Sequence, residues 1–266
     1  MRGYISYFKL QLINSLQYKT AAIAGIATQF FFGAVLIFIF DAFYKSGNAN
    51  QLISFKELIP YIWLNQAFFA LIYIMDDRDT TELIRTGSVC YELTKPYNLY
   101  VFWYIKILVK RYAAILLRFS PVIIISILLP APYNLTAPIS GIAFILFLIS
   151  LILGSFIISA MVMLINIFTF YNYSDSGIAD IIVLISRLLS GLVIPVVFLP
   201  NIIQKATFYL PFRLIGDLPF RIYTGNIMQN EAILSIILQV FWVVILIVIG
   251  LKLLKNAIRK IYIQGG

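Results

Sequence analysis

The sequence predicts an all-α membrane protein with six transmembrane helices. Hydrophobic residues make up 62% of the 266-residue chain and charged residues only 12%, whereas soluble domains carry roughly 25% charged residues. A transmembrane helix needs about 20 apolar residues. Residues 119–174 contain no Asp, Glu, Lys or Arg, so this stretch alone is long enough for two crossings.

The six predicted spans follow the charge-poor stretches of the chain. They cover residues 21–43, 58–75, 108–130, 139–170, 178–199 and 232–252. Pro130, Pro132 and Pro138 mark the turn between the third span and the fourth. The fourth span is longer than one crossing, so we expect it to extend beyond the bilayer or to break near Gly154. All six belong to a single transmembrane domain of residues 1–266.

Residues 1–20 predict a helix that lies along the membrane surface before the first span. Ile5, Phe8, Leu12 and Leu16 recur at helical spacing on one face, and polar residues occupy most of the rest. This pattern is typical of an interfacial amphipathic helix. A plain extension of the first span is the alternative.

The distribution of basic residues predicts the orientation in the membrane. Lys and Arg are concentrated in the segments that lie on the same side as the N-terminus, and such residues mark the cytoplasmic side. We therefore expect a multi-pass protein of the cell inner or plasma membrane with both termini in the cytoplasm. The net charge of +9 fits contact with acidic membrane lipids. It does not indicate a nucleic-acid partner, because no soluble module carries a basic patch.

The sequence lacks the residues that most catalytic and nucleotide-binding sites need. It contains no histidine and one cysteine, Cys90, which excludes Ser-His-Asp triads and His-based metal sites. No stretch reads G-x-x-x-x-G-K-[ST], the loop that cradles nucleotide phosphates. We therefore predict no catalytic residue, cofactor site or metal site in this chain.

A dense polar segment, residues 76–105, separates the second predicted span from the third. Asp79 or Thr80 is a plausible helix N-cap, and Gly87 is well placed to end the helix in a left-handed conformation. Leu83 and Ile84 are expected to pack inward. The side chains expected to face a soluble partner are those of Glu82, Arg85 and Thr86. A solvated turn between two spans is the alternative, but long ordered loops are usually functional.

This layout resembles the permeases of ABC-2-type ATP-binding-cassette exporters. The residues that carry the resemblance are Ile84-Arg85-Thr86-Gly87, followed by Leu93, Lys95 and Pro96. The resemblance implies that the segment is a coupling helix fitted into a separate ATPase subunit. That subunit would bind the ATP and Mg, and a second permease copy or paralogue would complete the assembly. The implied ATPase-coupling residues are Thr80, Glu82, Leu83, Arg85, Thr86 and Gly87.

Residues 200–230 predict a re-entrant segment at the outer side. Pro-Phe-Arg occurs at 211–213 and again at 219–221, and short proline-started helices suit a segment that dips into the outer leaflet and returns. The segment resembles the re-entrant outer helices of the same family. The alternative is a surface loop whose Phe212, Phe220 and Tyr223 are anchors at headgroup level.

Three polar residues within the spans are candidates for a substrate path or a seam between subunits: Arg187, Asp180 and Asn166. A central Arg costs roughly 3 kcal/mol on insertion scales, so Arg187 should face protein or water. A purely structural network that fixes helix packing is the alternative for all three.

The expected function is that of an exporter permease that moves an amphipathic substrate outward: a drug, a lipid or an antimicrobial peptide. An apolar, aromatic-rich wall selects poorly for polar solutes. The alternative function is a secondary, ion-coupled transporter. It would need buried carboxylates and broken helices near mid-membrane, for which Asp180 and Pro195 are the available candidates.

Overall fold

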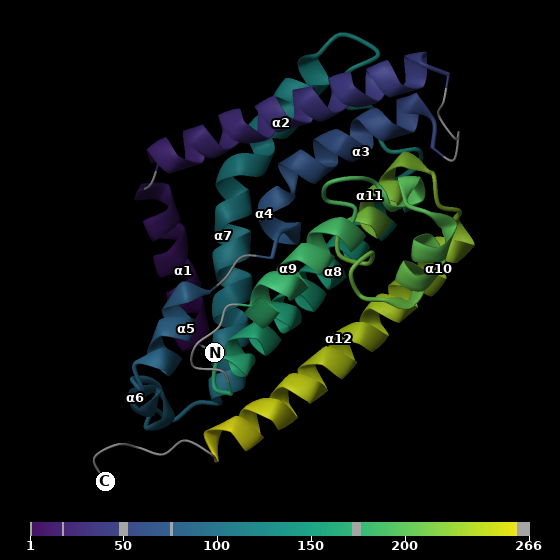
Figure 1. The fold of residues 1–266 in the computed structure, drawn as a ribbon. Coiled ribbons are helices and arrows are strands. Elements are labelled where there is room, and N and C mark those ends of the chain that lie inside the picture. The colour runs from purple at the N-terminus through teal and green to yellow at the C-terminus, as the bar shows by residue number, and fades with distance from the viewer. Residues whose placement is uncertain (1, 18, 48–52, 75–76, 172–176, 260–266) are drawn as a thin grey trace.

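A computed structural model describes residues 2–17, 19–47, 53–74, 77–171 and 177–259, and all regular secondary structure within them is helical (Figure 1). The elements are α1 (Arg2–Gln17), α2 (Lys19–Lys45), α3 (Phe55–Ala67), α4 (Phe69–Ile72), α5 (Arg78–Arg85), α6 (Val89–Leu93), α7 (Leu99–Leu128), α8 (Gly141–Phe168), α9 (Gly177–Leu189), the 3-10 turn η1 (Val196–Phe198), α10 (Asn201–Tyr209), α11 (Asp217–Thr224) and α12 (Gln229–Ile258).

Four helices in the described part of the chain are long and apolar enough to cross a membrane. They run over Ile23–Lys45, Leu99–Leu128, Gly141–Phe168 and Gln229–Ile258. Many of their outward-facing side chains are large and apolar, such as Phe38, Leu128 and Leu234. These helices confirm that the chain has the apolar spans of a membrane protein.

The other two predicted spans are interrupted in the structure. The described part of the predicted span 58–75 contains most of α3 and all of α4, with a break at Phe68, and every residue from Leu58 to Ala67 is buried. Residues 178–199 form α9, which ends at Leu189, followed by a turn in which Gly191 has φ +76°. Length therefore identifies four spans among the described residues, and the count of six stays a prediction.

Side-chain caps explain where several helices begin. Ser54 and Glu57 cap each other at the start of α3: the Ser54 N–H donates to the Glu57 carboxylate at 2.7 Å, and the Glu57 N–H donates to the Ser54 hydroxyl at 3.3 Å. Asn98 accepts from the Val101 N–H at the start of α7, and Ser140 accepts from the Ala143 N–H at the start of α8.

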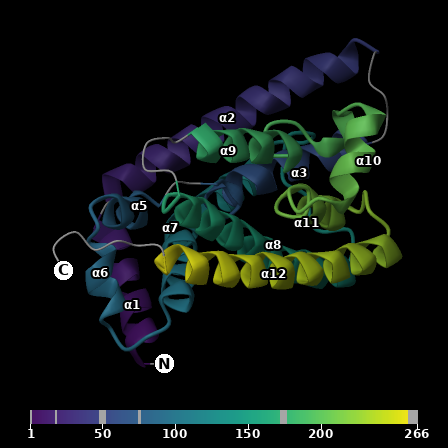
Figure 2. The same cartoon turned by 60° about the horizontal axis from the view of Figure 1, so that its bottom comes forward.

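Helix α8 is at the centre of the packing, between α7, α11 and α12 (Figures 1 and 2). It is continuous, so the expected break near Gly154 is wrong. Gly154 serves another purpose: a Cβ there would lie 2.8 Å from the carbonyl oxygen of Ile215. The missing side chain lets the backbone before α11 lie directly on α8.

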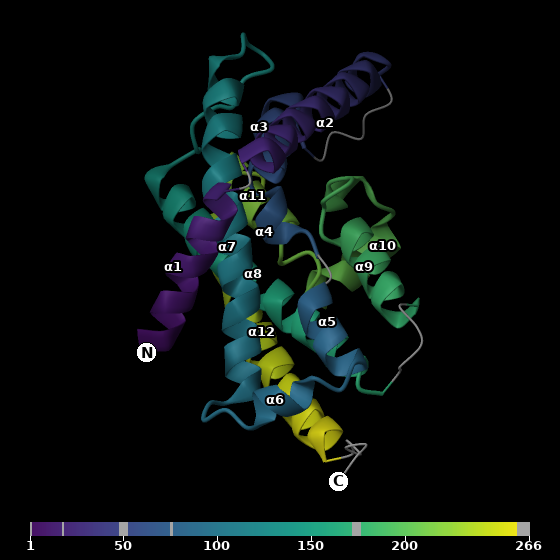
Figure 3. The same cartoon turned by 90° about the vertical axis from the view of Figure 1, so that its left-hand side faces the viewer.

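Helix α1 lies against the beginning of α7 (Figure 3). The rings of Tyr4 and Tyr7 lie 6.4 and 5.9 Å from that of Phe102. A helix is therefore present at Arg2–Gln17, within the predicted segment 1–20, and Ile5 on its apolar face is exposed, whereas its position along the membrane surface stays a prediction. The side chains of Leu12 and Leu16 lie outside the described part of the structure.

The polar segment and the predicted outer segment lie at opposite ends of the molecule (Figure 1). Helices α5 and α6 are close to the end of α12, and α10 and α11 are at the far end. This separation is what a cytoplasmic coupling segment and an outer segment require.

Candidate coupling site

Helix α5 begins earlier than the sequence predicted. Its N-cap is Asp77, so the prediction of Asp79 or Thr80 as N-cap is wrong. The Asp77 carboxylate binds side chains: it accepts hydrogen bonds from the Thr80 hydroxyl and from Lys110. The end of the helix is as predicted. Gly87 follows the C-cap Thr86 with φ +71°, a left-handed conformation that glycine adopts without strain.

The exposed face of α5 is polar and its inner face is packed. Glu82, Arg85, Thr86 and Gly87 are exposed, as are Arg78 and Asp79, which the sequence analysis did not assign to the coupling face. Ile84 is buried and Leu83 is half-buried. Thr80 is fully buried, so its side chain supports the helix from beneath rather than facing outward.

Helix α6 adds an aromatic side chain to this surface. Tyr91 is 75% exposed, which is unusual for so large a ring. Glu92 fixes the following turn by accepting hydrogen bonds from Lys95, at 2.6 Å, and from the Tyr97 hydroxyl. Partial burial would raise the pKa of the Glu92 carboxyl, but these two hydrogen bonds outweigh it and lower the pKa.

Two lysines of α7 bind side chains at the beginning of α5. Lys110 Nζ lies 2.9 Å from Asp77 Oδ1 and 2.5 Å from Asp79 Oδ2. Lys106 Nζ lies 3.4 Å from the Thr80 hydroxyl oxygen and 4.0 Å from Asp79 Oδ2. The hydrogen bond from Lys110 lowers the pKa of the Asp79 carboxyl. Sequence reasoning counted both lysines only as markers of the cytoplasmic side. Their i, i+4 spacing, which puts them on one helix face, was the available signal.

Arg111, next to Lys110, holds the end of α4. It is only 7% exposed, and its Nη1 donates to the carbonyl oxygens of Tyr73 at 2.8 Å and Leu71 at 3.3 Å. A cation is favourable at the C-terminal end of a helix, where carbonyl groups lack intrahelical partners. We call Lys106, Lys110 and Arg111 the α7 clamp, because together they hold the end of α4 and the beginning of α5.

The other side of Tyr73 contacts Arg187 of α9. The guanidinium carbon lies 4.7 Å from the centre of the Tyr73 ring, and Nη2 donates to the Tyr73 hydroxyl. Asp180 is exposed near the start of α9, and Asn166 is fully buried on α8 with no hydrogen-bond partner among the described residues. Among the described residues, Arg187 therefore contacts Tyr73 at the end of α4. No ion pair or hydrogen bond connects it to Asp180 or Asn166 there.

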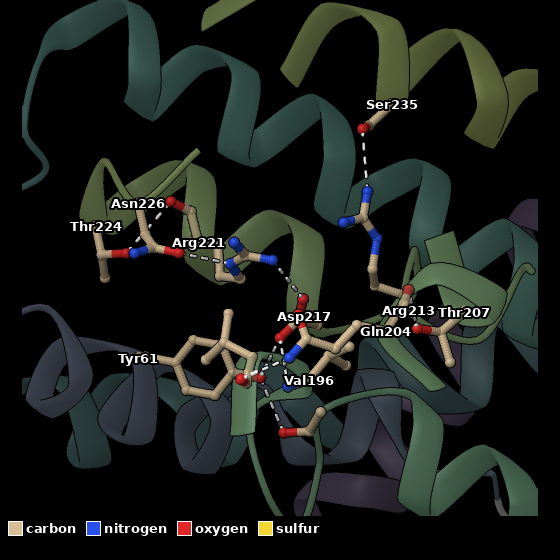
Figure 4. Close-up of polar contacts among 12 residues, drawn as sticks. Tyr61, Val196, Gln204, Thr207, Arg213, Asp217, Arg221, Thr224, Asn226 and Ser235 are labelled. Atoms are coloured by element: carbon tan, nitrogen blue, oxygen red, sulfur yellow. Dashed lines mark hydrogen bonds and ion pairs between the residues drawn. The ribbon is translucent and has the colours of Figure 1, made fainter. Parts of the chain in front are cut away.

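A second polar network lies at the opposite end, around Asp217 at the start of α11 (Figure 4). This carboxylate is fully buried. It accepts hydrogen bonds from the Tyr61 hydroxyl and the Val196 N–H, both at 3.1 Å, and pairs with Arg221 at 3.4 Å. The Tyr61 hydroxyl also lies 2.9 Å from the Gly191 carbonyl oxygen. One buried anion thus ties α11 to α3 and to the turn after α9.

The two Pro-Phe-Arg repeats are part of this packed end. Arg213 of the first repeat is buried, donates to the Ser235 hydroxyl at 3.3 Å and lies over the Phe208 ring at 4.4 Å. Phe220 of the second repeat is fully buried, and Tyr223 nearly so. The alternative of a surface loop with Phe212, Phe220 and Tyr223 as anchors is therefore wrong for Phe220 and Tyr223, whereas Phe212 is half-buried.

Comparison with known proteins decides the family. A family model described as ABC-2 family transporter protein matches residues 22–265, almost the whole chain. This chain belongs to the ABC-2 transporter family. No curated protein matches it.

Family membership and the apolar helices together identify this ABC-2 protein as a multi-pass membrane protein. ABC-2 permeases are normally non-enzymatic transmembrane subunits, and the family in general has an ABC ATPase as its partner. The polar networks of this chain fit such a role. Their charged side chains make ion pairs or hydrogen bonds between helices, an arrangement that positions the helices relative to one another.

Proposed function

We propose that this chain is the permease subunit of an ABC exporter, driven by a separate ATPase that docks on α5 and α6. One observation carries the proposal: a short helix with an exposed charged face is tied by partly buried ion pairs to a long apolar helix. An exposed helix without such ties would bind a partner but could not move the membrane region. The ATP and Mg would be held by the ATPase.

The docking surface combines charge with an aromatic group. Glu82, Arg85 and Thr86 provide polar contacts on α5, and the exposed Tyr91 adjoins them on α6. Tyr and Arg are enriched among residues that dominate binding at protein interfaces. The coupling role of residues 76–105 rests on this exposure and on the family resemblance.

The transported substrate is proposed to be amphipathic: a drug, a lipid or an antimicrobial peptide. An apolar cavity of about 740 Å³ lies between α2 and the segment after α9, within the range typical of small-molecule sites, roughly 300–1,000 Å³. Leu36 and Phe40 contribute to its apolar wall, and Asn201 and Gln204 are its polar members. A molecule with one polar end would match this lining.

The proposed arrangement puts α5, α6 and both termini in the cytoplasm of a cell inner or plasma membrane. The interrupted pieces α3–α4 and α9 would complete six passes, and residues 200–230 would be the re-entrant outer segment. A second permease copy or a paralogue would complete the assembly. The opposite ends occupied by α5 and α11 support this topology.

The alternative of a secondary, ion-coupled transporter would need a buried carboxylate that is free to exchange an ion. Asp180 is exposed. Asp217 is buried, but three donors from different segments occupy its carboxylate. These contacts favour a structural role for Asp217 and an ATP-driven function for the protein.

Charge reversal at Arg85 tests the docking role. We expect Arg85→Glu to abolish co-purification of the ATPase and to leave membrane insertion unchanged, because the side chain is exposed and makes no ion pair or side-chain hydrogen bond with the described residues. Lys205→Glu is the control, since Lys205 is an exposed basic residue on α10 at the opposite end. Normal co-purification with Arg85→Glu would remove the docking assignment.

A further inference from the structure

The α7 clamp holds both the end of α4 and the beginning of the proposed coupling helix α5. Arg111 binds the carbonyl groups at the end of α4, and Lys110 and Lys106 bind Asp77, Asp79 and Thr80 at the beginning of α5. All three basic residues lie within about a turn and a half of one helix. A displacement of α5 relative to α7 would break several of these contacts at once.

Burial makes the separation of part of the α7 clamp energetically unfavourable. The side chain of Asp77 is 5% exposed and that of its partner Lys110 is 33% exposed. Separating Asp77 from Lys110 would leave a buried carboxylate without its ion-pair partner, which is strongly unfavourable. Surface ion pairs contribute little by comparison. The Asp77–Lys110 pair therefore sets the relative position of α5 and α7, and the contacts of the more exposed Asp79 with Lys110 and Lys106 add to it.

Arg187 extends the connection to a further helix. It lies on the side chain of Tyr73, whose carbonyl oxygen is bound by Arg111. Tyr73 thus contacts two helices: its backbone carbonyl binds Arg111 of α7, and its side chain binds Arg187 of α9. Three helices that are far apart in the sequence meet at this point.

We infer that the α7 clamp makes α5 and α7 a single moving body, and that Arg187 on Tyr73 passes their movement to α9. This inference rests on the proposed function, because the movement would be started by the docked ATPase. Lys106, Lys110, Arg111 and Arg187 are then positioning residues. They neither contact nucleotide nor form the docking surface.

The test measures movement of α9 relative to α12 in the complex of the full-length chain with its ATPase. Leu184→Cys on α9 and Val244→Cys on α12 replace exposed side chains, in a Cys90→Ser background that removes the native cysteine. Spin labels at the two positions report their separation by pulsed electron paramagnetic resonance. The separation is compared without nucleotide and with ATP and vanadate.

We expect a nucleotide-dependent change of separation with the clamp intact, and its loss with Lys110→Met or with Arg187→Met. Lys110→Arg, which keeps the charge, should preserve the change. Lys255→Met removes an exposed lysine of α12 and is the matched control. Co-purification of the ATPase should be normal in every variant, because the exposed face of α5 is intact.

Three results would overturn the inference. The first is an unchanged movement of α9 in Lys110→Met and Arg187→Met. The second is loss of ATPase binding in Lys110→Met, which would limit Lys110 to shaping the docking surface. The third is an ATPase-bound parent complex in which nucleotide moves nothing. A parent chain that binds no ATPase would instead contradict the proposed function. Arg187→Met lies away from the docking surface and carries the test if Lys110→Met does not fold.

Discussion

Gly154 shows how a single missing side chain decides the packing at the centre of the molecule. The carbonyl oxygens of Leu214 and Ile215 approach α8 so closely at this residue that a Cβ would lie 3.2 and 2.8 Å from them. These atoms belong to the backbone before α11, which is itself held by the buried Asp217. Neither partner can move aside easily, because tightly packed interiors transmit strain.

The contact at Gly154 predicts a large cost for a small substitution. Gly154→Ala should lower the free energy of unfolding by about 1–3 kcal/mol, the usual cost of overpacking. Thermal unfolding in detergent measures it. Gly141→Ala is the control, because a Cβ at Gly141 meets no atom within 4 Å. Equal melting temperatures for the two variants would show that the chain can relax around Gly154.

Helix α5 depends on its attachment to α7, and one part of that attachment responds to pH. The pKa of Asp79 in the folded protein is lower than its usual value, chiefly because Lys110 donates a hydrogen bond to it. A group with a lowered folded pKa stabilises the folded state above its unfolded pKa, about 4 for Asp. The stabilisation is lost as the pH falls through the folded pKa.

We therefore expect α5 to loosen on acidification below about pH 4. Hydrogen exchange of its backbone amides, corrected for intrinsic rates, should rise more in the parent chain than in Asp79→Asn, which has no charge to lose. Amides within α8 are the internal reference. An equal acid response in parent and variant would show that the Asp79–Lys110 pair does not hold the helix.

At the level of elements, some features of the coupling segment could be predicted and others could not. The polar run and Gly87 predicted a short helix and its end, because turn chemistry is local. The clamp could not be predicted, because Lys110 and Asp77 are 33 positions apart. The break between α3 and α4 at Phe68 could not be predicted either, because no Gly or Pro lies there. There the half-buried ring packs against Phe119, Phe147 and Phe220, so tertiary contacts outweigh local preference.

For the whole molecule, the apolar composition was enough to predict a helical membrane protein, because soluble chains cannot expose so much apolar surface. It could not separate continuous spans from interrupted ones. Residues 58–75 and 178–199 are also rich in apolar side chains. The hydrogen bonds of Tyr61 and Asn65 to Gly191 nevertheless end α9 where hydropathy alone would continue it.

The proposed orientation predicts which ends of the molecule a membrane-impermeant maleimide can reach. In a Cys90→Ser background, Lys205→Cys on α10 should be labelled in intact cells. Thr94→Cys, just after α6, should be labelled only after the membrane is permeabilised. Both positions are exposed, so access depends on the side of the membrane. The reverse pattern would invert the topology and exclude a cytoplasmic ATPase on α5.

The enclosed carboxylate of Asp217 has a consequence for where cargo can leave. Water that reached this anion would compete for the donors from α3, from α11 and from the turn after α9, and so would loosen the packing at this end of the molecule, the proposed outer end. A water-filled channel that passes through one subunit at the position of Asp217 is therefore incompatible with this fold. We expect the cargo to exit along the flank of the chain, where a neighbouring subunit or lipid forms the opposite wall.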